Sequence, residues 1–597
     1  MCGICGELRF DGSSPDLSII KRMSAKIARR GPDHEAMISD GPLAFGHRRL
    51  SIIDLSASAD QPMVDKDLRL SLVFNGTIYN YKELRAELIE MGYAFFSEGD
   101  TEVIIKAYHA WGGKCVERFF GMFAFALWDM RHATLFMARD RFGIKPLYYS
   151  LDGARLRFAS NTQALLAAGG IDTSIDAIAL HHHFTLHAVV PAPRTILNGI
   201  KKIPPATTMT IKPDGATMHH TYWTLDATRP EQELSEQDWL KATRFVLSRA
   251  VERHRLASDV PVGVLLSGGL DSSLIVGLLA DHVENLLTFS VGFEDIGDGA
   301  EKGDEFEYSD QVVKHFNTRH HKFLIPNSEV LKRLPEAVEN MAEPMVSQDA
   351  IAFYLLSEKV SDEVKVVLSG QGADEVFGGY FWYPVMNQSS GSALKKFSLN
   401  YFDRDHAEFL QMINPAFHVP DVTSVLVENE LSKQEADTFL DQVLRFDTTT
   451  LIVDDPVKRV DNMTMAWGLE ARVPFLDHEL VELAAKMPQE LKLKEGGKFP
   501  LKAIARGLIP DSVIDRPKGY FPVPALKYVR GEFLEFMRKI LLSQTCIKRG
   551  LYQRDYVEKL LADPEKYLTR IQGSKLWHLA LLEYWLQLNV DSITADN

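Results

Sequence analysis

The sequence predicts two fold classes in one chain: an α+β N-terminal part built as a stacked β-sheet sandwich with helices, and an α/β part with a parallel sheet and a helical end. Two observations carry this prediction. Up to about residue 220, short aromatic and branched runs are cut by Gly, Asp and Asn. From Ser235 onward, strand-like runs alternate with helical patterns, which is typical of a parallel sheet that binds ligands at its strand C-termini.

In the N-terminal part, the predicted strands are short and few helices interrupt them. Strand-like runs cover 43–46, 70–74, 119–128, 134–138 and 156–159. Helical patterns cover 81–91 and 101–111, and a hairpin is predicted around 212–216. This arrangement favours stacked sheets over a doubly wound parallel fold.

The spacing of apolar residues changes to a helical period at Ser235. Ser235 forms a capping-box pattern with Asp238 at the start of a helix. Predicted strands follow at 262–266, 286–293 and 365–369, separated by helices. Beyond about residue 395 the pattern is mainly helical. The last apolar stripe, 576–588, is expected to pack in the core.

The length and charge bound the classes of function. The chain of 597 residues is too long for one core, and we expect domains at 1–220 and 235–597. A formal charge of −15 opposes binding to nucleic acid. Four cysteines are too few for a disulfide framework, and we see no signal peptide or membrane-spanning run, so we expect a cytoplasmic protein with no membrane partner.

The stretch 260–273 combines an apolar run, two glycines and a new apolar segment. We expect a strand at 262–266, a tight turn at Gly268 and Gly269, and a helix over about 272–282. A helix N-terminus behind a glycine loop can bind a phosphate. The stretch lacks the Gly-Lys-Ser/Thr end of a Walker loop. Its Ser-Gly-Gly-Leu-Asp-Ser core resembles the pyrophosphate loop of ATP-pyrophosphatases, which cleave ATP between its α and β phosphates.

The chain begins with Met1-Cys2-Gly-Ile-Cys5. A small residue at position 2 favours removal of Met1, which would place the Cys2 thiol beside its own α-amino group. A thiol titrates near pH ~8.5 and an α-amine near ~8, so the amine can serve as the base for the nucleophile. Two alternatives remain: Cys2 and Cys5 form a Cys-x-x-Cys metal or redox pair, although no second ligand pair follows, or they simply begin a strand.

Five ordered motifs resemble those of class II glutamine amidotransferases. They are Arg-Gly-Pro-Asp at 30–33, Gly-His-Arg-Arg-Leu-Ser-Ile-Ile-Asp at 46–54, Asn-Gly-Thr-Ile-Tyr-Asn at 75–80, Gly-Asp-Thr-Glu at 99–102 and Ala-Arg-Asp-Arg-Phe-Gly-Ile-Lys-Pro-Leu-Tyr at 138–148. The resemblance implies that Cys2 attacks the glutamine side-chain amide and that ammonia leaves from a thioester. Asn75 and the Gly76 N–H would form the oxyanion hole, in which one donor is typically worth about 2.7–4 kcal/mol.

The same resemblance implies how glutamine is held. Arg49 would bind its α-carboxylate and Asp100 its ammonium, because these are the complementary charges. Thr77, also counted in the glutamine site, departs from the family pattern, since relatives most often carry Glu there. A hydroxyl cannot supply the second negative charge, which puts glutamine affinity in doubt. His47 is expected to pack or orient rather than catalyse.

A glutaminase followed by a pyrophosphatase loop resembles asparagine synthetase of the glutamine-hydrolysing type. The resemblance covers nearly the whole chain and weakens over about 385–440 and after about 530. It implies that ATP activates a carboxylate as an acyl-adenylate, which ammonia from the first site then attacks after passing through an internal tunnel. Relatives are often homodimers, but the sequence itself carries no interface signal.

The resemblance also assigns the ATP site. It comprises Leu266, Ser267, Gly268, Gly269, Asp271, Ser272, Val291, Ser369 and Gly370. Asp271 and Asp374 would hold Mg²⁺, since two carboxylates from separate loops suit a cation that bridges phosphates. Lys498 matches the lysine expected on the α-phosphate during acyl transfer. The segments 454–465 and 469–478 would close this site, or their charged residues form helix-surface pairs.

Gln371 is the informative departure at the acceptor site, because asparagine synthetases usually carry an acidic residue there. Glutamine cannot balance the ammonium of aspartate. Together with the stretches 303–310 and 343–353, which include Glu343 and Asp349 as acceptor-pocket residues, it resembles the N-acetylglutaminylglutamine amidotransferase branch. That branch amidates the terminal carboxylate of an acetylated dipeptide to make an osmoprotectant.

Four alternatives stay in view. The first is asparagine synthetase itself, which predicts pyrophosphate release that depends on aspartate. A β-lactam synthetase relative would not need the Cys2 glutaminase motifs. A non-catalytic amino-acid sensor would be expected to lose Cys2, Asp271 or Lys498, all of which are present. A metal site at the run 181–183 lacks acidic or cysteine partners in sequence, so a polar helix segment is favoured.

Overall fold

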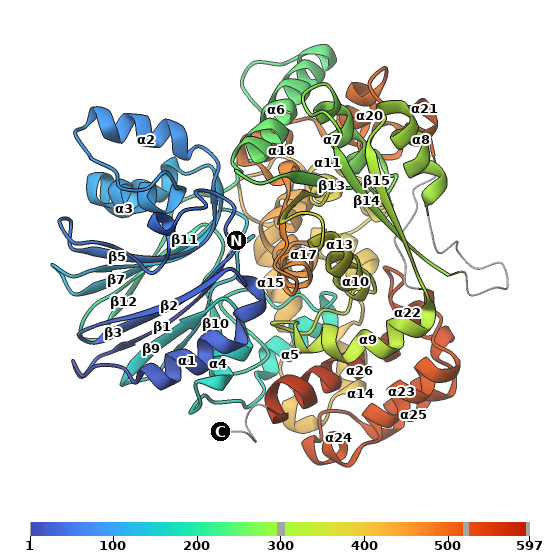
Figure 1. The fold of residues 1–597 in the computed structure, drawn as a ribbon. Helices are drawn as coiled ribbons and strands as arrows, with labels where there is room; N and C mark the ends of the chain where they lie inside the picture. The colour runs from blue at the N-terminus through green and yellow to red at the C-terminus, as the bar shows by residue number, and fades with distance from the viewer. Residues whose placement is uncertain (1, 295–304, 517–523, 593–597) are drawn as a thin grey trace.

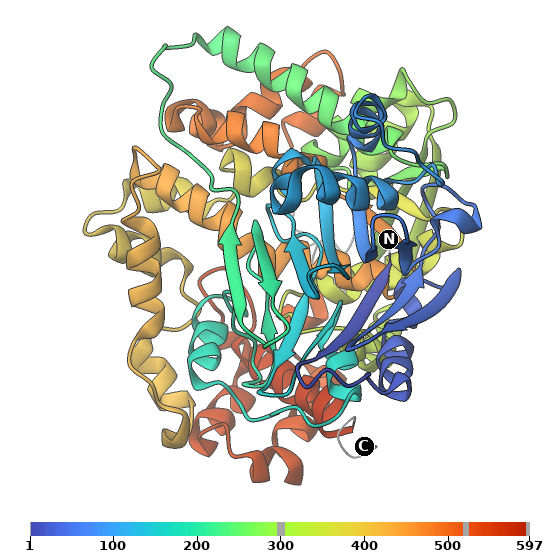
Figure 2. The same ribbon diagram turned by 90° about the vertical axis from the view of Figure 1, so that its left-hand side faces the viewer.

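The computed structural model describes residues 2–294, 305–516 and 524–592. Two stacked antiparallel sheets form one side of the molecule, and a parallel sheet with many helices forms the other (Figure 1). This confirms the predicted fold class. Figure 2 shows the sandwich from its outer side, with the helices behind it and at its edges.

The first sheet runs in the order β10-β8-β9-β1-β3-β2, and the second in the order β12-β11-β7-β6-β5-β4. The first contains β1 (Gly3–Arg9), β2 (His34–Asp40), β3 (Leu43–Arg49), β8 (Tyr148–Leu151), β9 (Arg155–Ala159) and β10 (Lys201–Lys202). The second contains β4 (Met63–Asp65), β5 (Leu70–Ile78), β6 (Gly121–Asp129), β7 (Thr134–Arg139), β11 (Thr207–Ile211) and β12 (Thr217–Thr221). The predicted hairpin at 212–216 joins β11 to β12.

Apolar side chains fill the space between the two sheets because alternate residues of each strand face inward. Ile4 of β1, Phe45 of β3 and Val73 of β5 belong to this buried cluster. Helices cover the outer faces: α1 and α4 lie on the first sheet, and α2 and α3 on the second (Figure 1). The bounds of the helices in this part are α1 (Leu17–Lys26), α2 (Tyr81–Glu90), α3 (Asp100–Trp111), α4 (Thr162–Ala167) and α5 (Ala177–Thr185).

The third sheet is parallel, in the order β15-β14-β13-β16-β17. The predicted strands correspond to β13 (Val262–Leu265), β14 (Leu287–Phe293) and β16 (Val366–Leu368), while β15 (Arg319–Ile325) and β17 (Glu470–Arg472) were not predicted. β15 was not predicted because it is an edge strand rich in His, Arg and Lys. β17 was not predicted because only three residues of a charged motif pair with β16.

Helices surround this sheet and form the C-terminal part. The first group is α6 (Glu236–Leu256), α7 (Leu270–Ala280), α8 (Phe306–Phe316), α9 (Asn327–Glu339), α10 (Asp349–Ser361), α11 (Ala373–Phe377) and α12 (Trp382–Gln388). The second is α13 (Ala393–Tyr401), α14 (His406–Met412), α15 (Val422–Leu431), α16 (Phe439–Phe446), α17 (Lys458–Met465), α18 (His478–Ala485), α19 (Gln489–Leu493), α20 (Phe499–Ala505), α21 (Asp511–Ile514), α22 (Pro524–Lys527), α23 (Gly531–Leu541), α24 (Gln544–Arg549), α25 (Arg554–Ala562) and α26 (Lys575–Trp585).

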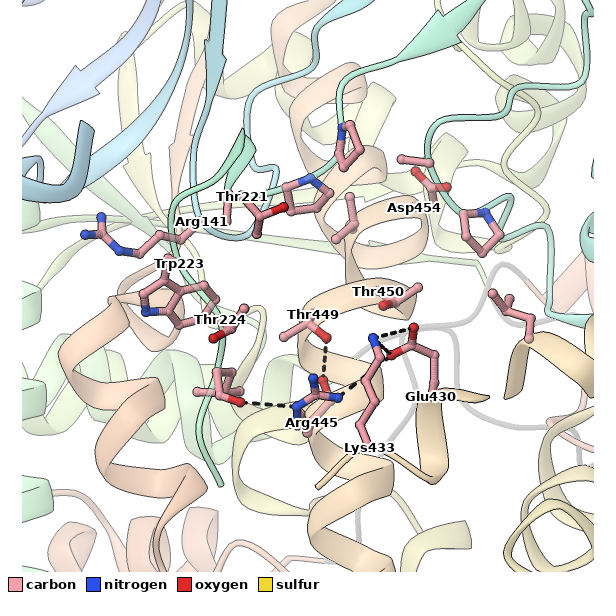
Figure 3. A pocket seen from close by; sticks show the side chains of 18 residues that line it. Arg141, Thr221, Trp223, Thr224, Glu430, Lys433, Arg445, Thr449, Thr450 and Asp454 are labelled. Atoms are coloured by element: carbon pink, nitrogen blue, oxygen red, sulfur yellow. Dashed lines mark hydrogen bonds and ion pairs between the residues drawn. The ribbon is translucent and has the colours of Figure 1, made fainter. Parts of the chain in front are cut away.

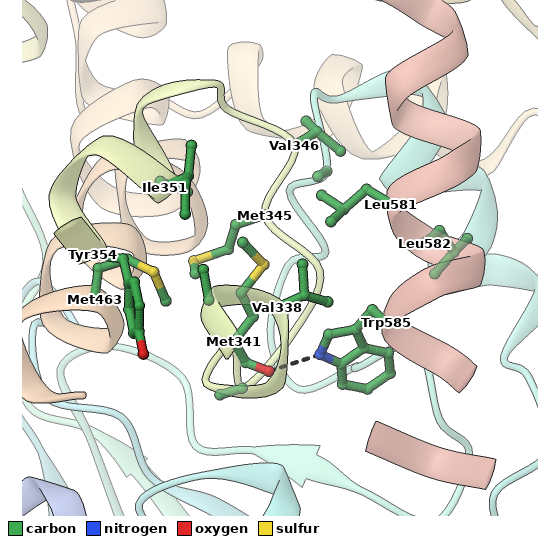
Figure 4. Close-up of a cluster of buried hydrophobic side chains, with 14 of the residues drawn as sticks. Val338, Met341, Met345, Val346, Ile351, Tyr354, Met463, Leu581, Leu582 and Trp585 are labelled. Carbon is green, nitrogen blue, oxygen red and sulfur yellow. Dashed lines mark hydrogen bonds between the residues drawn. The ribbon is translucent and has the colours of Figure 1, made fainter. Parts of the chain in front are cut away.

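Local signals explain several helix ends. Ser235 and Asp238 form the predicted capping box at the start of α6. The predicted apolar stripe of α26 is buried, and the chain continues beyond Trp585 as a π-helix over Leu586–Asp591. Figure 4 shows part of this core, where Trp585 donates a hydrogen bond of 2.7 Å to the Met341 carbonyl oxygen. Met345 and Met463 belong to the same buried cluster.

Among the described residues, no helix combines the length and the apolar character that crossing a bilayer requires.

Candidate active sites

The Cys2 backbone lies at the start of β1, beside the end of β5. Its N–H donates to Asn75 Oδ1 at 3.1 Å, and its carbonyl oxygen accepts from Arg30 Nε at 3.3 Å. Burial raises the pKa of the Cys2 thiol, against the lowering effect of Arg49. The thiol is therefore protonated at neutral pH and needs a base beside it to become a nucleophile.

Asn75 and Gly76 lie in β5, and the Asn75 side chain contacts the Cys2 backbone. Among the described residues, none accepts a hydrogen bond from Asn75 Nδ2, although that atom is buried. A buried unpaired donor is costly unless a ligand uses it. A side chain at Gly76 would place Cβ 2.2 Å from the Met122 carbonyl oxygen, so only glycine lets β5 approach β6 there. Both features suit an oxyanion site.

The two predicted glutamine-binding charges differ in their surroundings. The guanidinium of Arg49 donates to Asp60 Oδ1 at 2.7 Å and to the Ser56 carbonyl oxygen at 2.9 Å, and also to the Asp54 carbonyl oxygen. Asp100 begins α3, and its Oδ2 accepts the Ile78 N–H at 3.0 Å. No described lysine or arginine side chain forms an ion pair with Asp100, and burial raises its pKa to about 6.

The second site lies where the parallel strands end. β13 and β16 are neighbours, so the loops that follow them meet. The loop after β13 needs Gly268, which has φ +77° and whose Cβ would lie 2.7 Å from the Ser309 amide nitrogen. α7 begins at Leu270, slightly earlier than predicted, which places Asp271 in its first turn.

A cavity of about 160 Å³ opens between these loops. It is lined by ten of the predicted residues, namely Leu266, Ser267, Asp271, Ser272, Val291, Asp349, Ser369, Gly370, Gln371 and Asp374. Leu265, Phe289, Ser290, Phe353 and Leu356 complete the lining. Gly268 and Gly269 shape the loop without lining the cavity. The size and the mixed lining suit part of a nucleotide and a small acceptor.

Lys498 joins the two predicted metal carboxylates. Its Nζ lies 2.7 Å from Asp271 Oδ2 and 2.8 Å from Asp374 Oδ1. Burial opposes its charge, but the two carboxylates outweigh that effect and raise the pKa of Lys498. Two carboxylates that converge on one cation form a donor set that fits a divalent ion.

Glu343, also predicted for the acceptor pocket, lies outside the lining of this cavity. Lys202 Nζ lies 3.0 Å from Glu343 Oε1 and donates to Asp454 Oδ2 at 2.5 Å, while the Tyr148 hydroxyl donates to Glu343 Oε1 at 3.0 Å. Lys458 completes this buried cluster. Tyr148 and Lys202 come from the sandwich, so Glu343 joins the sandwich to the helical part.

A larger cavity of about 260 Å³ is lined by Asp454 of that cluster and by Arg141, Trp223, Lys433 and Arg445 among others (Figure 3). In Figure 3, Lys433 reaches Glu430, and the Thr449 hydroxyl donates to the Arg445 carbonyl oxygen. None of the predicted catalytic residues lines it.

Three charged residues that the motifs alone did not single out lie at the two sites. Arg30 touches the Cys2 carbonyl and pairs with Asp461 at 3.0 Å, and Arg459 lies 3.1 Å from Asp349. Glu470 of β17 accepts a hydrogen bond of 3.2 Å from Thr77. Their positions within the charged motifs 30–33, 454–465 and 469–478 are the signal that could have identified them.

The remaining candidates have partners inside the protein. Cys5 is buried in the core, and Gly46 leaves room for its sulfur. His181 lies in α5 as expected for a helix segment, but buried, where its ring nitrogens contact Thr423 Oγ1 and His406 Nδ1. Of the stretch 303–310, residues 303 and 304 lie outside the described residues, as does Met1.

Family models match both parts of the chain. The glutamine amidotransferase domain matches residues 1–223 and asparagine synthase matches residues 242–587. This chain belongs to the glutamine-hydrolysing asparagine synthetase family. It is 33% identical over 99% of its length to asparagine synthetase [glutamine-hydrolyzing] 1 of Bacillus subtilis, covering 97% of that protein. It is 34% identical over 87% of its length to a putative asparagine synthetase [glutamine-hydrolyzing] of Mycobacterium bovis, covering 86% of that protein.

One solved structure, glutamine phosphoribosylpyrophosphate amidotransferase from B. subtilis, matches 54% of this chain and 91% of its own, with a TM-score of 0.30 and 13% identity. That likeness carries no functional argument. Family membership itself shows that the chain is a carbon–nitrogen ligase of the glutamine-dependent amidotransferase type.

Proposed function

We propose that this enzyme amidates the terminal carboxylate of N-acetylglutaminylglutamine, using ATP and ammonia from glutamine. Residues 1–220 would release the ammonia and residues 235–597 would use it, in the cytoplasm. The identity of the acceptor is inferred from the charge of the cavity lining. Gln371 lines it as a neutral group, and Lys498 or Arg459 pairs with each carboxylate that lines it.

An acceptor without a free amino group fits this charge distribution. Asp349 Oδ1 accepts from Ser347 Oγ at 2.6 Å and lies 3.1 Å from Arg459 Nε. An aspartate ammonium would therefore compete with an arginine for the carboxylate and find only an amide at Gln371. An acylated nitrogen places no cation there.

At the first site, the thiol of Cys2 would pass its proton to its own α-amine and attack the glutamine amide. The oxyanion would form opposite the unpaired Asn75 Nδ2 and the Gly76 N–H. The α-amine, now protonated, would return the proton to the leaving nitrogen, so that ammonia departs and a thioester remains. Water would then release glutamate and restore the thiol.

At the second site, the acceptor carboxylate would attack the α-phosphorus of ATP, and pyrophosphate would leave. Asp271 and Asp374 would hold Mg²⁺, whose chemistry is to offset phosphate charge when it is bound. Lys498 would then be released from these carboxylates to neutralise the α-phosphate. Ammonia would attack the acyl carbon, AMP would leave with the electron pair of the broken bond, and the nitrogen would lose one proton to water.

The test is pyrophosphate release by the purified enzyme with ATP, Mg²⁺ and glutamine, with N-acetylglutaminylglutamine or aspartate as acceptor. We expect turnover with the acetylated dipeptide and an amide product one mass unit lighter than the acceptor. Turnover with aspartate but not with the acetylated dipeptide would refute the proposal. That second candidate, asparagine synthesis, is favoured by the names of the relatives.

The two-site model has a separate test. Cys2→Ala should abolish synthesis driven by glutamine but leave synthesis driven by added ammonia. Loss of both activities in a folded variant would contradict a division of labour between the two sites.

A further inference from the structure

The glutamine pocket has an acidic neighbour that comes from the other half of the molecule. Thr77 lies in β5, two residues after Asn75, so both side chains point to the same face of the strand. That face holds Cys2. Thr77 Oγ1 donates to Glu470 Oε1 at 3.2 Å, and Glu470 belongs to β17 of the parallel sheet.

We infer that Glu470 supplies, from the synthetase sheet, the second carboxylate that recognises the α-ammonium of glutamine beside Asp100. It would thereby replace the acidic side chain that position 77 lacks. This inference rests on the proposed glutaminase role of the Cys2 site. It assigns a specificity-determining residue, because Glu470 acts on binding and takes no part in bond making.

The electrostatics of the pocket favour this role. The Glu470 carboxyl is fully buried, which opposes its ionisation, but the charge of Arg472 lowers its pKa to about 2. Glu470 is therefore ionised at every physiological pH. Its charge is also among the causes that raise the pKa of Asp100, so the two carboxylates act on the same region. A cation between them would relieve this repulsion.

Arg472 orients Glu470 and is itself held by other groups. Its Nε donates to Glu470, its Nη1 donates to the His254 carbonyl oxygen, and its guanidinium lies 5.7 Å from the centre of the Tyr79 ring. Its Nη2 also donates to Thr77 Oγ1 at 3.5 Å, so the guanidinium contacts both halves of the molecule beside Glu470. The arginine thus positions the carboxylate at the pocket.

The experiment compares glutamine with glutaramate, which is glutamine without its α-amino group. Hydrolysis of each by the full-length enzyme is followed as ammonia release, so that no acceptor is needed. In Glu470→Gln, kcat/KM for glutamine should fall about 10- to 100-fold, the usual effect of losing a charged partner, while kcat/KM for glutaramate changes little. The loss should lie mainly in KM.

Thr77→Glu provides the rescue. In the double variant Thr77→Glu with Glu470→Gln, a carboxylate returns to the pocket from the other side of the contact, and the preference for glutamine should recover. If the role of Glu470 were purely structural, Glu470→Gln would lower the hydrolysis of both substrates equally, and Thr77→Glu would not restore it. Either of those results would overturn the inference.

Lys365→Met is the matched control, because it removes a side-chain ion pair of 2.7 Å with Asp33 across the same contact but keeps the backbone carbonyl that accepts the Glu470 N–H. Its preference for glutamine should be unchanged. If Glu470→Gln does not fold, Glu470→Asp keeps the charge but shortens the reach, and its preference should fall about 3- to 10-fold. An unchanged preference in Glu470→Asp would count against the inference. Failure of the glutaminase role itself would appear separately, as hydrolysis that survives Cys2→Ala.

Discussion

Gly379→Ala should disable the synthetase site while leaving the glutaminase site intact. The added Cβ would lie 2.2 Å from Lys498 Cε and 2.3 Å from Asp374 Oδ1. Carbon atoms in contact normally lie about 3.5–4.0 Å apart, so the end of the Lys498 side chain must move by more than about 1 Å. The lysine would then leave the position between the two carboxylates.

The expected loss follows from that displacement. A misplacement of about 1 Å can cost about 100-fold in rate, and one charge-stabilising group is worth about 2.7–4 kcal/mol at a transition state. We therefore expect kcat for pyrophosphate release with added ammonia to fall about 100-fold or more. The cost to folding should be near the low end of the usual 1–3 kcal/mol for overpacking, because the clash is with the end of a flexible chain.

The assay measures pyrophosphate release and glutamine hydrolysis on the same preparation, with thermal unfolding as the measure of stability. Gly153→Ala is the matched control, because no heavy atom lies within 4 Å of its added Cβ. Normal pyrophosphate release by Gly379→Ala would show that the position of Lys498 is unimportant. An equal fall in hydrolysis would show that the whole fold is disturbed, and would also refute the reasoning.

Three further predictions concern the glutaminase and the contact between the halves. Asn75→Ala should lower kcat for glutamine hydrolysis about 100- to 1000-fold and spare synthesis from ammonia; an unchanged rate would remove Asn75 from the oxyanion site. Asp100 has a folded-state pKa of about 6, above the ordinary 3.8, so kcat/KM for glutamine should fall as the pH drops through about 6, and Asp100→Asn should flatten this limb of the profile. Because the folded chain holds that proton more tightly, the stability that Asp100 contributes below pH ~4 is lost as the pH rises through about 6. Lys202→Met should cost about 3 kcal/mol in denaturant unfolding, since Glu343 and Asp454 stay buried with only one lysine; a loss below about 0.5 kcal/mol would contradict this.

Much of the fold could be predicted from the sequence where one local signal dominated. The capping box of α6 and the turn at 212–216 depend on a few adjacent residues, and both lie where the sequence places them. β17 could not be predicted, because Glu470 and Arg472 are charged residues, which do not form an apolar strand pattern. Both side chains are buried only when the two halves of the chain pack together. Burial of charge depends on tertiary packing, which cannot be read from a short segment of sequence.

The sites show the same division. The ten cavity residues could be predicted because parallel strands bring their C-terminal loops together, so motifs far apart in sequence meet. Glu343 could not be placed, because its motif precedes α10 and shares its sequence neighbourhood with Asp349. The two side chains diverge: Asp349 faces the cavity and Arg459, whereas Glu343 faces Lys202. Proximity in sequence is a poor guide where a loop turns between two surfaces.

The two departures from the family pattern have different consequences. Thr77 lacks a carboxylate, and Glu470, 3.2 Å from its hydroxyl, is already paired with Arg472, but Asp100 has no lysine or arginine partner among the described residues and can face an ammonium. Gln371 also lacks a carboxylate, but the acidic side chains around it are already held by Lys498 and Arg459. Under the proposed function, one site would still select an amino acid with a free α-amine, while the other would favour an acceptor whose nitrogen is acylated. An enzyme that amidated aspartate would need the same field at both sites.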